Sequence, residues 1–182
     1  MMVLRADERK EYFSNYLPLL FYAGVYEGIL PESSTLADFA ETSLEEKVAC
    51  RDVLFKDPDV LSDFRKDNSR FLKIKGATFI DDLSKGILSN FIVLQQKKAF
   101  AVFMDTQTGM FYHVMGISDP FDELLNYIPC YVETAIFNFN DKLICDGLLK
   151  GGNIQIGPNY KRQFSEDYRE QLKEKKVINL LP

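Results

Sequence analysis

Two carboxylates in the C-terminal half of the sequence are the strongest candidates for chemistry. Glu133 lies in one apolar run and Asp146 ends the next. Asn140 and Asp141, between these runs, tolerate the positive φ that a two-residue hairpin turn needs. If the hairpin turns there, Glu133 lies roughly opposite Leu148, two positions from Asp146 and within reach of a diagonal neighbour. Paired carboxylates can carry out acid–base catalysis or bind a divalent cation.

Two further polar residues follow these runs. Tyr160 and Arg162 come after a glycine-rich segment, and Arg162 could hold an anionic substrate beside the carboxylates. The alternative is a structural role, in which Arg162 or Lys142 neutralises a carboxylate and Asp146 shapes a turn. We favour the structural role. Glu133 and Asp146 remain the candidate catalytic residues, and Tyr160 and Arg162 the candidate ligand-binding residues.

Histidine-dependent chemistry would depend on one residue. His113 is the only histidine, and it lies between Tyr112 and Val114 in a run with strand character. A lone strand histidine is usually a surface residue or a hydrogen-bonded polar one, so we predict no catalytic role for it. The sequence contains no Walker phosphate loop, GxSxG nucleophile elbow, HExxH zinc motif or EF-hand loop. We therefore predict no bound metal and no cofactor.

The composition is that of a globular protein with an acidic N-terminal part. Hydrophobic residues make up 46% of the chain and charged residues 27%, which are ordinary values. The net charge of −5 argues against nucleic acid or an anionic membrane as the partner. Residues 1–68 carry eight Lys or Arg against fourteen Asp or Glu, whereas residues 69–182 carry fourteen against thirteen. This distribution favours a protein partner or a small ligand.

The cysteines and the N-terminal sequence bear on the compartment. Cys50, Cys130 and Cys145 are too few and too scattered for a disulfide framework or a zinc knuckle, so we predict buried thiols. The first residues, MMVLRADERKEYF, lack the apolar core of a signal peptide, and no uncharged run approaches membrane-spanning length. We predict a cytoplasmic protein without a membrane segment.

The N-terminal part of the chain predicts helices. Apolar residues recur at helical spacing from about 7 to 23, and Pro18 predicts a kink or a restart. Thr42 and Ser43 each have a glutamate three residues later, Glu45 and Glu46, which is the capping-box spacing, so a helix should begin at one of them. Asp57 precedes a proline and indicates the start of another helix. Residues 71–75 alternate apolar and basic side chains in the manner of a strand.

The rest of the chain predicts an antiparallel sheet. Residues 90–117 contain three apolar runs separated by QQKK and DTQTG, which indicates two consecutive hairpins. The middle run, 99–104, is apolar on both faces, so it should be a central strand covered on each side. A second hairpin is predicted from 130–139 and 142–149. Ser165 should cap a final helix, with acidic residues in its first turn and basic residues in its last.

Several segments of the sequence resemble a family of uncharacterised bacterial proteins. In that family a helical N-terminal part precedes a sheet with an LPF…IIYDG-like stretch, and the similarity covers roughly Tyr12 to Leu181. Asn138 stands where the family tends to have proline, and Cys145 where it tends to have tyrosine. No activity is assigned to the family, so the resemblance implies a fold and draws attention to Asp146. The segments that carry it are DPDVLSDFRKDNS, NFIVLQQKKAFAVFMD, ISDPFDELL, ETAIFNFNDKLICDGLL and IGPNYKRQFSEDYRE.

These patterns together predict an α+β fold. Residues 1–68 should form an acidic helical N-terminal portion packed on an antiparallel sheet of about five or six strands. Residues 69–182 should hold that sheet and a C-terminal helix covering one face, with both portions in one compact unit. The favoured function is an interaction or regulatory module that binds a protein partner or a small ligand. The alternative is a metal-assisted or acid–base hydrolase that uses Glu133 and Asp146.

Overall fold

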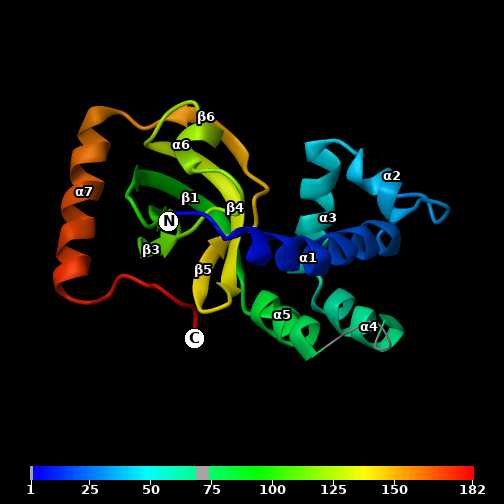
Figure 1. The fold of residues 1–182 in the computed structure, drawn as a ribbon. Helices are drawn as coiled ribbons and strands as arrows, with labels where there is room; N and C mark the ends of the chain where they lie inside the picture. The colour runs from blue at the N-terminus through cyan, green and yellow to red at the C-terminus, as the bar shows by residue number, and fades with distance from the viewer. Residues whose placement is uncertain (1, 69–73) are drawn as a thin grey trace. The chain divides into compact units, whose positions relative to one another are not determined.

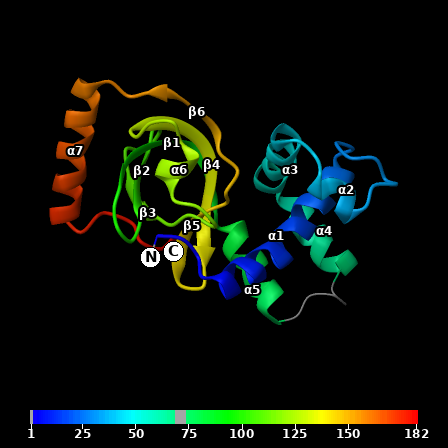
Figure 2. The ribbon, with the colours of Figure 1, turned by 45° about the horizontal axis from the view of Figure 1, so that its top comes forward.

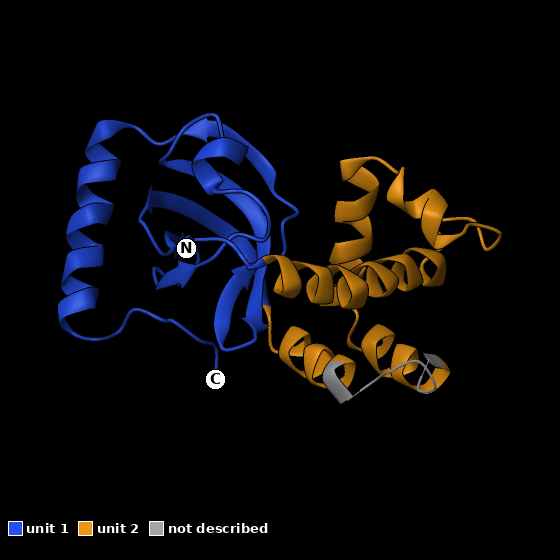
Figure 3. Ribbon diagram, viewed as in Figure 1, with its two compact units in different colours: residues 1–5, 87–182 blue, residues 6–86 orange. Residues whose placement is uncertain are grey.

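The chain has an α+β fold, as the sequence predicts, and its elements fall into two compact units (Figures 1 and 3). The computed structural model describes residues 2–68 and 74–182. Residues 6–86 form the helical unit, and residues 1–5 together with 87–182 form the sheet unit. The sequence predicts that the sheet portion begins at residue 69, whereas in the structure residues 74–86 belong to the helical unit, and 74–84 of these form a helix.

The helical unit is built around its first and longest helix. This helix continues through Pro18 as a single element, so the predicted restart is wrong. One face of it is buried on both sides of the proline, from Tyr12 to Ala23, and this packing offsets the one backbone hydrogen bond that Pro18 removes. The described helices of this unit are α1 (Ala6–Tyr26), α2 (Leu36–Ala40), α3 (Leu44–Lys56), α4 (Pro58–Asn68) and α5 (Ile74–Ser84).

Local capping sets where these helices begin. The Ser43 hydroxyl accepts a hydrogen bond from the Glu46 N–H at 3.2 Å, and the Glu46 carboxylate accepts one from the Ser43 N–H at 2.9 Å. This confirms the predicted capping box, and these bonds from Ser43 lower the pKa of Glu46. Asp57 accepts from the Asp59 N–H at 3.0 Å at the start of α4. The strand predicted at 71–75 falls largely outside the described residues, and its last two residues begin α5.

Gly24 lets α1 pack closely against its neighbours in the helical unit. A Cβ atom at this position would lie 2.7 Å from the Cys50 sulfur on α3 and 2.7 Å from Cδ1 of Leu30. Both contacts are far shorter than van der Waals separation, and both side chains are buried. A larger residue at position 24 therefore forces the surrounding core to move.

We expect Gly24→Ala to lower the free energy of unfolding by about 1–2 kcal/mol. Alanine is the better helix former, but the overpacked methyl group outweighs that gain. Urea unfolding of the wild type and the variant measures the difference. The cost should shrink in a Cys50→Ala background, where the nearest sulfur is removed. A Gly24→Ala protein more stable than the wild type would show that this contact is not limiting.

The sheet unit contains a six-stranded antiparallel sheet that curls on itself (Figure 2). Its order is β3-β2-β1-β4-β5, and β6 pairs with β4. The two ends of this order meet, because the Met115 N–H donates to the Leu143 carbonyl at 2.9 Å and the Cys145 N–H donates to the Met115 carbonyl at 3.0 Å. The strands are β1 (Ile87–Gln96), β2 (Ala101–Asp105), β3 (Phe111–Val114), β4 (Cys130–Phe139), β5 (Lys142–Cys145) and β6 (Lys150–Gln155).

Strand β2 is central, as its apolar pattern predicts. All five of its residues are buried, and it pairs with β1 on one side and β3 on the other. The turn that follows it also agrees with prediction. The Gly109 N–H donates to the Asp105 carbonyl at 2.8 Å, with Gly109 at a φ of +69°. The Asp105 side chain accepts from the Gln107 N–H at 2.8 Å.

The last helix, α7 (Pro158–Lys173), covers one face of the sheet, which confirms the predicted C-terminal helix. The predicted Ser165 cap is wrong, because the helix begins earlier, at Pro158, and the Ser165 hydroxyl donates to the Lys161 carbonyl within it. Tyr168 is its buried residue, and its ring lies 5.5 Å from that of Phe111 on β3. The other side of the sheet encloses a separate core that includes Phe121 of the short helix α6 (Phe121–Leu124). Within the described residues, no helix is both long enough and apolar enough to cross a membrane.

Candidate functional site

The hairpin of β4 and β5 positions the candidate carboxylates. Asn140 and Asp141 adopt φ values of +48° and +57°, and the predicted register holds from Phe139↔Lys142 to Ile136↔Cys145. Beyond Cys145 the register changes, because the chain bends at Gly147, whose φ is +83°, and then continues along β4 as a further antiparallel strand, β6. Glu133 therefore pairs with Lys150, and the prediction that it lies opposite Leu148 is wrong.

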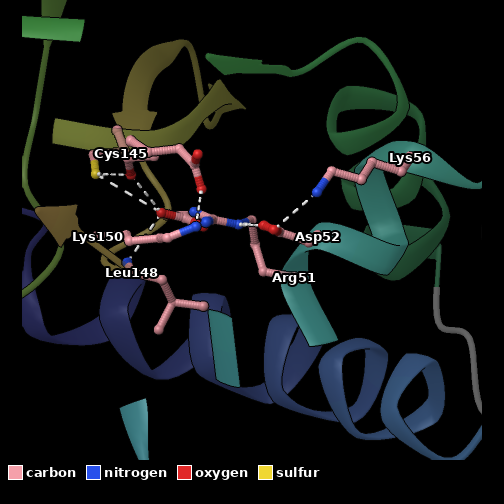
Figure 4. Close-up of polar contacts among 9 residues, drawn as sticks. Arg51, Asp52, Lys56, Cys145, Leu148 and Lys150 are labelled. Carbon is pink, nitrogen blue, oxygen red and sulfur yellow. Dashed lines mark hydrogen bonds and ion pairs between the residues drawn. The ribbon is translucent and has the colours of Figure 1, made fainter. Parts of the chain in front are cut away.

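Asp146 is a buried carboxylate held at the end of β5, with 3% of its surface exposed. Its Oδ1 accepts a hydrogen bond from the Thr134 hydroxyl at 2.8 Å and another from the Leu148 N–H at 3.0 Å (Figure 4). Its own N–H donates to the Ala135 carbonyl at 2.9 Å. The residue thus joins the turn after β5 to strand β4, as the structural interpretation predicts.

Cys145 and Thr134 complete this buried cluster. The Cys145 sulfur lies 3.1 Å from the Thr134 hydroxyl oxygen, and it accepts from the Gly147 N–H at 3.5 Å. Because the Thr134 hydroxyl donates to the Asp146 carboxylate, it is free to accept from the Cys145 thiol.

Glu133 has a different partner within the sheet unit. Its carboxylate lies 3.3 Å from the ammonium of Lys150, and the two side chains are 28% and 59% exposed. Ion pairs this accessible to water contribute about 1 kcal/mol or less to stability. Lys150 is therefore a cation beside Glu133 that is not among those considered from the sequence, Arg162 and Lys142.

Tyr160 and Arg162 lie on the first two turns of α7 and are exposed. The Tyr160 side chain is 62% exposed, and its ring stacks on that of Phe164 at a centroid distance of 5.9 Å. Among the contacts of the described chain, Arg162 binds neither candidate carboxylate. The structure thus presents these two residues as surface groups near the end of β6.

The helical unit contains a buried cation that residue type alone would not predict. Arg51 has no exposed surface, and its Nε donates to Asp52 at 2.7 Å, while Lys56 lies 3.0 Å from the other oxygen of Asp52 (Figure 4). Burial raises the pKa of Asp52, but the hydrogen bonds from Lys56 and Arg51 outweigh it and hold the pKa below its usual value. Position 51 lies three residues from both Val48 and Leu54, so apolar periodicity does place it on the buried face.

His113 also has partners that sequence spacing cannot show. Its Nδ1 lies 2.7 Å from the Asn179 side-chain oxygen, and its Nε2 lies 2.9 Å from the Tyr168 hydroxyl. The Phe100 ring stacks on the imidazole at 3.8 Å. These residues lie far apart in sequence and meet because α7 and the C-terminal residues pack on the sheet. The histidine is a hydrogen-bonded polar residue, as predicted.

The cysteines are buried, as predicted. Burial raises the pKa of the Cys50 and Cys130 thiols to about 11, so both are protonated at neutral pH. Within the described chain, no group of three or more His, Cys, Asp or Glu side chains is arranged to hold a metal ion.

Comparisons with protein-family models, curated proteins and solved structures found no match for this chain. The resemblance to the family with the LPF…IIYDG-like stretch therefore stays a prediction. Function must be argued from the residues themselves. The buried Asp146 joins backbone segments, whereas exposed apolar side chains of the sheet unit include Ile154 on β6 and Tyr160 and Leu172 on α7.

Proposed function

We propose that this protein is an interaction module that binds an extended segment of another protein along the outer edge of β6. The observation that supports the proposal is the exposure of β6 and of its outer edge. Among the described strands, only β4 pairs with β6, and five of its six residues are exposed. An exposed strand edge presents unpaired main-chain donors and acceptors, which an added strand can satisfy.

The main-chain geometry identifies the groups that an added strand would use. The Ile156 N–H donates to the Pro129 carbonyl at 3.0 Å, and Ile154 pairs with Tyr131, so the main-chain groups of these two residues face β4. Main-chain groups alternate in direction along a strand, and those of Gln155 therefore face outward. Gln155 is the position where a partner strand would form main-chain hydrogen bonds.

The side chains around this edge favour an apolar partner segment. Ile154 is 61% exposed and lies beside the half-buried Tyr131 across the ladder. Tyr160 and Arg162 lie a few residues after the end of β6. Tyr and Arg are among the residue types that contribute most binding energy at protein interfaces. A partner segment with apolar residues at alternate positions would place one beside Ile154.

The test is a selection of peptides from a displayed random library on the wild-type protein, followed by calorimetry with the selected peptides. Gln155→Pro removes the outward N–H at a position where an edge strand tolerates proline. We expect it to weaken binding by about tenfold or more, the effect of losing one or two hydrogen bonds. Gln155→Ala, the matched control, should bind as the wild type does. Failure to enrich any peptide, or equal affinity for all three proteins, would contradict the proposal.

A further inference from the structure

His113 connects three segments of the sheet unit. The residue itself lies on β3, one ring nitrogen contacts Tyr168 on α7, and the other contacts Asn179 in the C-terminal residues. The main chain adds to this connection. The His113 N–H donates to the Ile178 carbonyl at 2.9 Å, and the Ile178 N–H donates to the Phe111 carbonyl at 2.9 Å. Side chain and backbone at this position thus attach both the helix and the C-terminal residues.

The two ring contacts suit a neutral imidazole. The Asn179 side-chain oxygen can only accept, so Nδ1 carries the proton and donates to it. Nε2 then accepts from the Tyr168 hydroxyl. When Nε2 becomes protonated, its new hydrogen and the hydrogen of the Tyr168 hydroxyl would both point into the space between these two atoms. The hydroxyl must then turn its hydrogen away from its described acceptor, and among the described residues no carboxylate contacts the new charge.

The charged groups on the surrounding segments do not stabilise an imidazolium. Tyr168 is the titratable side chain that contacts the ring, and no charged side chain of the described residues contributes to the shift of the His113 pKa. Burial lowers this pKa, and the hydrogen bond with Asn179 only partly offsets the effect, so the pKa stays below 6.5. Charged residues near in sequence to the residues that contact the ring include the half-buried Asp167 and the exposed Lys97, Lys98, Arg169, Lys175 and Lys176.

The helix that His113 holds covers an apolar surface of the sheet. Tyr168 and the partly buried Phe164 are the α7 residues packed on this surface, and Val177 adds to it from the C-terminal residues. If α7 moves away, this apolar surface is exposed to water. Such exposure is unfavourable unless another group covers the surface. The sheet residues concerned are Ile92, Leu94, Val102, Met104 and Phe111.

We infer that His113 is an acid-sensitive latch whose protonation loosens α7 and residues 177–181 from the sheet. The folded state binds this proton more weakly than the unfolded chain does. The stability that the latch contributes is therefore complete above the unfolded pKa of 6.5 and is lost as the pH falls through the lower folded value. Local opening of α7 exposes the apolar surface while the inner core of the sheet stays closed.

Amide hydrogen exchange, expressed as protection factors to remove the intrinsic pH dependence, tests the latch. Between about pH 8 and about pH 5, protection of α7 and residues 177–181 should fall. The fall should be about tenfold for each pH unit by which the pKa of His113 is lower in the folded protein than in the unfolded chain. Protection in β1 and β4 should change little. His113→Gln cannot titrate in this range, so its α7 protection should not depend on pH. Asp167→Asn is the matched control on α7 and should behave as the wild type does.

A second measurement needs no variant. The chain has one histidine, so its imidazole resonances report His113 directly in an untagged protein. They should titrate below pH 6.5, together with the loss of α7 protection. Equal protection at both pH values, or equal losses in the wild type and His113→Gln, would overturn the inference. So would imidazole resonances that titrate at or above the unfolded value.

Discussion

Replacing Val102 with aspartate should prevent the sheet unit from folding. Val102 has no exposed surface, and its strand β2 is paired on both sides. Its side chain belongs to the core between the sheet and α7. An aspartate there would be a buried charge, and its cross-strand neighbour His113 has a lowered pKa and carries no charge at neutral pH. The cost is several kcal/mol, which is comparable with the whole stability of a domain of this size.

Circular dichroism and thermal melting measure this effect. We expect Val102→Asp to be insoluble or to lack a cooperative transition. Gln107→Glu is the matched control, because it also adds a carboxylate, in the exposed turn that follows the same strand. This control should melt within a few degrees of the wild type. A Val102→Asp protein that melts cooperatively near the wild-type midpoint would show that β2 is not central to the fold.

Removing the Asp146 carboxylate should produce the second largest effect. In Asp146→Ala, the Thr134 hydroxyl and the Leu148 N–H each lose the hydrogen bond to this carboxylate. The Thr134 hydroxyl is buried, and an unsatisfied buried donor costs about 1–3 kcal/mol, so we expect a loss of about 1–3 kcal/mol in the free energy of unfolding. Asp146→Asn keeps an acceptor oxygen and should cost less. Urea unfolding of both variants and of Thr134→Val provides the measurement and a double-mutant cycle.

The same variants separate a structural Asp146 from a catalytic one. If Asp146 and Glu133 formed a metal-assisted hydrolytic site, magnesium, manganese or calcium would raise the wild-type melting temperature, and Asp146→Asn would abolish the rise. We expect melting temperatures that are the same with chelator and with metal. An Asp146→Ala protein as stable as the wild type would show that this carboxylate does not hold the turn in place.

Features of the fold that depend on interactions between residues close in sequence could be predicted. Ser43 and Glu46 cap α3 through bonds that span three residues, and Asn140 and Asp141 turn the β4–β5 hairpin with the positive φ their type tolerates. The central position of β2 follows from its apolar residues on both faces. In each case the interactions that decide the structure lie within a few residues of one another.

Predictions failed where a distant segment decides the outcome. The Pro18 restart does not occur, because packing along α1 outweighs one lost backbone bond. The register expected for Glu133 fails because the chain leaves the hairpin at Gly147 and a new strand, β6, pairs there. Counting residue pairs outward from a hairpin turn gives the register only while the same two strands remain paired. Nothing in the β4 sequence specifies where β5 ends.

The sequence alone determined the residue types available for chemistry: one histidine, three cysteines and two carboxylates near a hairpin. Only the tertiary structure decided what each of them contacts. His113 meets Tyr168 and Asn179 across 55 and 66 residues of chain, and Asp146 meets Thr134 across 12. Such contacts depend on how the sheet curls and where α7 packs. Both follow from the burial of apolar surface. The hydrophobic effect is non-directional and does not depend on how far apart the buried residues are in the sequence.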